Sequence, residues 1–164
     1  MLICQEMFLL LTKDNGKKEA VTNNETALSA GLFSDLLMHD AVGISAKNKV
    51  HATDKKPEHP VLAWAWDGLH ERRTSSVKTL LQARWFSPRE KIAQDFRDHG
   101  QLEIEDAAWW QLGGDRYIMT DTALEDEVRE RLAAVLDGTQ NPSIKDMIIL
   151  DILREVNGAY PLLK

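Results

Sequence analysis

Three basic residues, Arg84, Arg89 and Lys91, lie around the predicted start of a helix at Ser87. The first backbone N–H groups of a helix have no intrahelical acceptor, and they carry the positive end of the helix dipole. Together with nearby cationic side chains, such groups suit the binding of a phosphate. The sequence therefore predicts an anion site around Arg89. The alternative is a solvated face whose charges pair with neighbouring carboxylates.

Two adjacent tryptophans, Trp109 and Trp110, are the second feature that could carry a function. Neighbouring side chains on a strand point to opposite faces, so one core cannot bury both rings. Tryptophan is favoured at membrane interfaces and at the centres of protein–protein contacts. We therefore expect a surface for membrane contact or self-association here, with packing on the domain's own helices as the alternative.

Signatures of catalysis and metal binding are missing from the sequence. The five histidines have no metal-ligand spacing, and there is no nucleophile elbow, P-loop or dinucleotide-binding motif. The single cysteine, Cys4, excludes an intrachain disulfide and fits a reducing, cytoplasmic environment. We expect no enzymatic activity, no metal and no cofactor.

The composition is that of a soluble globular domain. The chain has 164 residues, of which 43% are hydrophobic, and this length suits one domain with a real core. A net charge of -6 argues against a nucleic-acid binder, which usually carries a basic face. The apolar segment 2–11 is too short to cross a bilayer and is expected to be a buried first helix.

A helix followed by a β-hairpin is the best-specified local unit. Ser87 is a candidate N-cap, Pro88 takes the first helical position, and Gly100 can close the helix in the left-handed conformation. Residues 102–105 (LEIE) alternate apolar and charged, as a half-buried strand does. Residues 108–112 (AWWQL) are the expected return strand.

Helical periodicity dominates the rest of the chain. Asn23 or Asn24 can cap a second helix, and Ser75 or Ser76 another. A short hairpin is expected around Lys47, and the last helix is apolar on most sides, so we expect it to be central. The predicted fold is mainly α, a multihelical single domain with a projecting β-hairpin. The remaining helices are expected around residues 62–69, 77–85, 121–137 and 143–156.

The order of these elements resembles the Golgi phosphoprotein 3 family, including its bacterial homologues. The similarity runs over nearly the whole chain and is carried by the series rather than by one motif. Family chains usually continue with further helices, so the resemblance implies a single domain over residues 1–164 that lacks them. The matching stretches are 6–16, 27–42, 50–69, 89–102 and the helix from Asp121.

The resemblance implies peripheral attachment to membranes through phosphatidylinositol 4-phosphate, and in eukaryotes adaptor work on Golgi enzymes. The family's lipid pocket uses a tryptophan before the second helix, an arginine early in that helix and two arginines at the start of a later one. These positions fall near Ala20 or Val21, at Ser29, at Phe86 and at Arg89. Only Arg89 keeps the family's residue. Lys17, Lys18 and Arg84 are the cations near the altered positions that are candidates to compensate for them.

These observations together predict a non-catalytic protein on the cytoplasmic face of a membrane. Arg89, helped by Arg84 and Lys91, contacts the phosphate of an anionic or phosphoinositide lipid, and the hairpin with Trp109 and Trp110 contacts the bilayer or builds a homo-oligomer. One alternative is a self-association domain that binds no lipid. A second alternative is a winged-helix-like nucleic-acid module. The acidic strand and the net charge count against it, and we expect no nucleic-acid partner.

Overall fold

Helix α1 (Ile3–Leu10) forms the centre of the fold in the computed structural model, which describes residues 1–20, 23–108 and 114–156. All of its residues are buried, as predicted for segment 2–11. Its two polar residues are paired: the Gln5 amide donates to Asp95, and Glu6 accepts from Arg131. A short apolar helix can therefore be enclosed on all sides without unsatisfied polar groups.

Helix α2 (Asn24–Met38) packs directly on α1. A Cβ atom at Gly31 would lie 3.2 Å from the Cα atom of Cys4, so a larger residue there would push the two helix backbones slightly apart. The Asp35 carboxylate accepts hydrogen bonds from the backbone N–H groups of Ile3 and Cys4 at 2.8 and 2.9 Å. An acidic side chain thus caps the N-terminus of α1 and fixes the two helices against each other.

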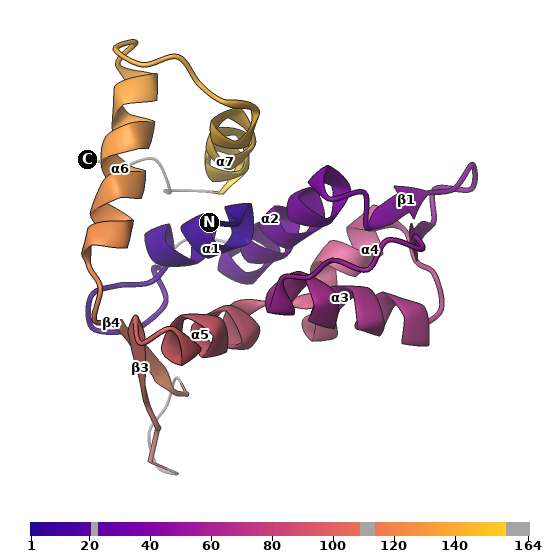
Figure 1. Ribbon diagram of the computed structural model, residues 1–164, viewed down its shortest axis with the longest axis horizontal. Helices are drawn as coiled ribbons and strands as arrows, with labels where there is room; N and C mark the ends of the chain where they lie inside the picture. The colour runs from indigo at the N-terminus through magenta and orange to yellow at the C-terminus, as the bar shows by residue number, and fades with distance from the viewer. Residues whose placement is uncertain (21–22, 109–113, 157–164) are drawn as a thin grey trace.

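The other helices surround this pair (Figure 1). Helices α5, α6 and α7 contact α1, while α3 and α4 pack against α2. Ser76 accepts a hydrogen bond from the Thr79 N–H, so its predicted role as an N-cap is confirmed. Gly100 follows α5 with φ +70, as predicted for a C-terminal glycine. The elements are α3 (Pro60–Glu71), α4 (Val77–Gln82), the 3₁₀ helix η1 (Arg84–Phe86), α5 (Arg89–Asp98), α6 (Ala123–Leu136) and α7 (Ile144–Glu155).

Two antiparallel hairpins complete the described part of the chain. The first pairs β1 (Val42–Ile44) with β2 (Val50–Ala52), as predicted, and the second pairs β3 (Leu102–Glu105) with β4 (Arg116–Met119). The prediction of a mainly α fold with a projecting β-hairpin is confirmed.

The prediction that 108–112 is the return strand is wrong. In the observed register Leu102 faces Met119 and Ile104 faces Tyr117, so apolar side chains of both strands share the face toward the core. Pairing with 116–119 places Tyr117 6.1 Å from the Phe8 ring, which explains why this later segment is used. Trp109 and Trp110 lie outside the described residues.

The expectation that the last helix is central is also wrong. Helix α7 buries Asp146, Ile149 and Leu153, while Ile144 and Met147 are exposed. The more uniformly apolar α1 already occupies the centre, so α7 covers it from one side only.

Candidate anion-binding site

A cavity of about 540 Å³ opens where α2, η1 and the start of α5 meet. Three of its lining residues are cationic, and each comes from a different segment: Lys18 from the loop before α2, Arg84 from η1 and Arg89 from α5. Of the site residues predicted from the sequence, the structure brings Arg84 and Arg89 together here. Lys91 is half-buried on α5 and is not among the residues that line the cavity.

Arg89 is buried and held on every side. Its Nε–H donates to Glu25 Oε1 at 2.7 Å, its Nη1–H donates to Thr12 Oγ1 at 3.3 Å, and its Nη2–H donates to Asn24 Oδ1. The guanidinium carbon lies 5.7 Å from the centre of the Phe8 ring. Arg89 is therefore a fixed cation at the wall of the cavity.

Glu25, in the first turn of α2, receives three charged or hydroxyl donors. Lys18 Nζ lies 2.8 Å and Arg89 Nε 2.7 Å from Oε1, and Ser87 Oγ donates to Oε2 at 2.5 Å. Burial by itself raises the pKa of this carboxyl, but the charge of Arg89 and the hydrogen bonds from Lys18, Ser87 and Arg89 lower it to about 2. Glu25 is consequently ionised throughout the neutral range.

The predicted N-cap role of Ser87 is wrong. Helix α5 begins at Arg89, with Pro88 at the N-cap position and no side-chain capping hydrogen bond. The Ser87 hydroxyl is instead used by Glu25, a partner 62 residues away. A charged acceptor makes the stronger hydrogen bond, so this tertiary contact replaces the local cap.

The positions implied by the family resemblance divide between the cavity and its surroundings. Ser29 and Arg89 both line the cavity. Phe86 is buried in the core beside Trp85, and Ala20 is exposed. Sequence reasoning missed Glu25, because an acidic residue in the first turn of a helix is already explained by the helix dipole.

Comparison of the sequence with known protein families identifies the family of this chain. The sequence model of the Golgi phosphoprotein 3 (GPP34) family matches residues 3–163. The chain belongs to the Golgi phosphoprotein 3 (GPP34) family. The match confirms the family resemblance predicted from the separate stretches, and extends it over nearly the whole of this chain. A search of curated proteins finds no significant match.

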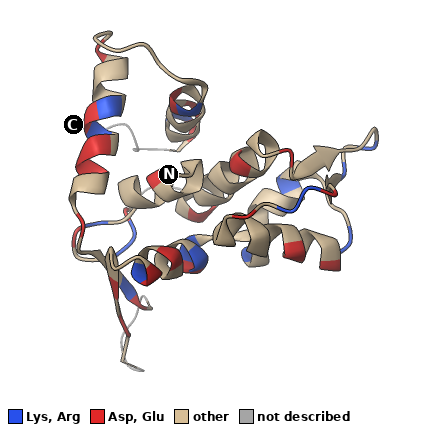
Figure 2. Cartoon of the chain, viewed as in Figure 1, with Lys and Arg blue, Asp and Glu red and all other residues tan. Residues whose placement is uncertain are grey.

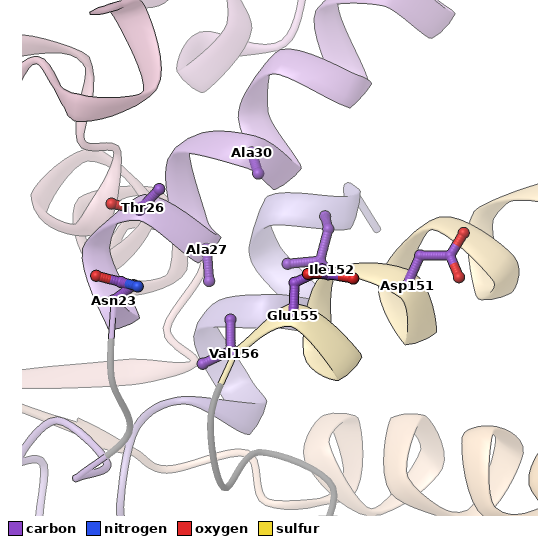
Figure 3. A pocket seen from close by; sticks show the side chains of 8 residues that line it. All are labelled: Asn23, Thr26, Ala27, Ala30, Asp151, Ile152, Glu155 and Val156. Carbon is purple, nitrogen blue, oxygen red and sulfur yellow. The ribbon is translucent and has the colours of Figure 1, made fainter. Parts of the chain in front are cut away.

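A second cavity of the GPP34 chain, of about 350 Å³, lies between α2 and α7. Figure 3 shows Ala27 on α2 facing Ile152 on α7 and Val156, the residue that follows α7. The charged residues that line it, Asp151 and Glu155, are both acidic. This cavity repels anions, so the basic cavity is the better candidate for a phosphate.

Charges of both signs are interleaved on the described helices of this GPP34 chain. Figure 2 shows basic and acidic residues alternating on α5 and on α6. With a net charge of -6, attraction to an anionic surface has to come from a local group of cations. The cavity with Lys18, Arg84 and Arg89 is such a group.

The described residues contain neither a candidate metal site nor a candidate membrane-spanning helix. No group of three or more His, Cys, Asp or Glu side chains there could hold a metal ion. No helix among those residues is both long and apolar enough to cross a membrane.

Proposed function

We propose that this GPP34-family chain is a non-catalytic peripheral membrane protein that binds the head group of phosphatidylinositol 4-phosphate at the basic cavity. The observation that supports the proposal is the convergence of Lys18, Arg84 and Arg89 from three separate segments on one opening. Family membership supports it independently.

The chemistry of the cavity suits a phosphomonoester. Such a group carries a charge of about -1.5 to -2 at neutral pH and three acceptor oxygens. The planar guanidinium of Arg89 offers directed donors from a fixed position, while Arg84 and Lys18 are exposed and can turn toward a ligand. The cavity volume of about 540 Å³ is within the usual range for a small-ligand pocket.

The β3–β4 hairpin supplies the second contact in the proposal. Figure 1 shows this hairpin projecting away from the helices. The segment between its strands contains Trp109 and Trp110, which suit the interfacial region of a bilayer. Lys91 adds charge near the cytoplasmic leaflet, whose anionic lipids attract each basic residue by about 1 kcal/mol.

Co-sedimentation with vesicles tests this function. Neutral vesicles are compared with vesicles that contain phosphatidylserine or phosphatidylinositol 4-phosphate. We expect selective pelleting with the phosphoinositide, and a roughly fivefold loss of affinity in Arg84→Gln, corresponding to one basic contact. Arg73→Gln is the matched control, because Arg73 is exposed and does not line the cavity. Equal pelleting with both anionic lipids, or none with either, would overturn the proposal.

Self-association through the hairpin is a second candidate function. In the described part of the sheet, β3 pairs with β4 on one side only. An unpaired strand edge can accept a strand from a second copy, although Glu103 and Glu105 limit this on β3. Sedimentation velocity on the wild type and on Trp109→Ala distinguishes the two functions. A dimer that the substitution dissociates, without lipid binding, would favour self-association.

A further inference from the structure

We infer that Glu25 sets which ligand the basic cavity accepts: its carboxylate occupies the anion position, and an incoming phosphate binds by displacing it. This inference rests on the proposed function and concerns the selectivity of the same site. Glu25 is then a specificity-determining residue, because every anion that enters must outcompete it.

The donors around Glu25 show that the anion position is already filled. Lys18, Ser87 and Arg89 all direct a donor at this one carboxylate, at distances of 2.5–2.8 Å. The same three residues line the cavity and would contact a phosphate there. A phosphate and the Glu25 carboxylate therefore compete for one set of donors.

The exposure of the two partners identifies the one that can leave. The Glu25 side chain is 37% exposed, whereas that of Arg89 is 9% exposed. A carboxylate that already contacts water regains hydration when it turns outward, but a buried guanidinium without an anion is strongly unfavourable. When Glu25 turns outward, the buried Arg89 guanidinium loses its counter-charge, and a bound phosphate restores one.

The exchange favours one chemical class of ligand. A singly charged phosphodiester or carboxylate replaces the single negative charge of Glu25 by another, so its binding gains little electrostatic free energy. A phosphomonoester brings up to one further charge and three oxygens, enough for each of the donors that Glu25 uses. Displacement of Glu25 costs free energy for every anion, and the further charge and third oxygen allow the phosphomonoester to recover that cost.

Glu25→Gln tests the competition, with Glu127→Gln as the matched control. Glu127 is exposed on α6 and does not line the cavity, and its substitution changes the net charge by the same amount. We expect Glu25→Gln to bind phosphatidylinositol 4-phosphate vesicles roughly tenfold more tightly than the wild type, since the competent state no longer has to be opened. We also expect Glu25→Gln to gain measurable binding to phosphatidylserine vesicles, and Glu127→Gln to match the wild type.

Glu25→Asp provides a second variant in case Glu25→Gln does not fold. It keeps the charge but withdraws the carboxylate from Arg89, so we expect a smaller gain in affinity. If the wild type binds the phosphoinositide vesicles and neither Glu25 variant binds more tightly than Glu127→Gln, the inference is wrong and the proposed function stands. If no protein binds those vesicles or soluble inositol 1,4-bisphosphate, the proposed function itself is wrong.

Discussion

Two arginine–carboxylate clusters in this molecule have opposite patterns of exposure. In the structural cluster (Glu6, Arg131, Lys145 and Asp146), Arg131 bonds Glu6 and Asp146 at 2.8 Å each and links α1, α6 and α7. Both carboxylates are 3% exposed, and Arg131 is 29% exposed. In the cavity cluster (Lys18, Glu25, Ser87 and Arg89), the arginine is the buried partner and the carboxylate is the more exposed one, at 37%.

This difference separates a structural role from a binding role. A buried carboxylate cannot be released without stranding a charge, so the structural cluster is closed. A partly exposed carboxylate on a buried arginine can be exchanged for another anion, and of these two clusters the cavity cluster offers such an exchange. The following predictions test this contrast in order of decreasing effect.

Arg131→Met has the largest expected effect. It removes the guanidinium that pairs with the buried carboxylates of Glu6 and Asp146, and leaves Glu6 with Lys145 at 3.5 Å. We expect the free energy of unfolding to fall by about 3 kcal/mol, as for other broken buried pairs. Urea unfolding measures the change. The control, Arg154→Met, removes an exposed pair with Asp151 and is expected to change stability by less than about 0.5 kcal/mol. Equal effects of the two substitutions would contradict the contrast.

Arg89→Met is expected to destabilise less, by about 2 kcal/mol, because Glu25 can turn to water while only Asn24 and Thr12 lose a buried donor. The same urea titration applies. A loss as large as that of Arg131→Met would show that Glu25 cannot be released, and would remove the basis of the exchange.

Acid titration gives a smaller effect with a defined sign. The folded-state pKa of Glu25, about 2, lies below its ordinary value of 4.5, so its ionisation stabilises the fold above pH 4.5 and this stabilisation is lost as the pH falls toward 2. Solvent screening reduces the effect, because the side chain is partly exposed. We expect the stability difference between wild type and Glu25→Gln to shrink from pH 4.5 to 2. A difference independent of pH would contradict the ion pair.

A pair of serine substitutions has the smallest effect. Ser143 Oγ accepts from the Asp146 N–H at the N-terminus of α7, and Ser143→Ala is expected to destabilise by about 1 kcal/mol, as for a lost N-cap. Ser87→Ala removes one donor from the partly exposed Glu25 and is expected to change stability by about 0.5 kcal/mol. Thermal unfolding compares the two variants. A larger destabilisation by Ser87→Ala than by Ser143→Ala would count against a releasable Glu25 in the cavity cluster.

Local signals in the sequence predicted most of the fold. Helical periodicity located the helices, Ser76 and Gly100 marked helix ends, and the alternating LEIE segment gave β3. Local signals could not predict which of several distant segments pairs with a strand or occupies the core. The strand that pairs with β3 was misplaced, and α7 was taken as central, because local patterns do not state which apolar segment the core selects.

In the candidate site, too, the residues close in sequence were predictable and the long-range partner was not. Arg84 and Arg89 are close in sequence and were predicted to contact one phosphate together with Lys91, whereas the structure brings Arg84 and Arg89 to one opening without Lys91. Glu25 lies 64 residues before Arg89, and nothing in the local pattern distinguishes it from any other acidic residue in a first helical turn. Only the tertiary structure shows that it is the partner of the buried arginine.

The most direct test is the titration of the Glu25 carboxyl by carbon-13 NMR, without and with saturating inositol 1,4-bisphosphate. We expect a pKa of about 2 in the free protein, and a rise toward or above the ordinary value of 4.5 when the phosphate takes the donors. A low pKa that is unchanged by bound phosphate, or an ordinary pKa in the free protein, would contradict the displacement of Glu25.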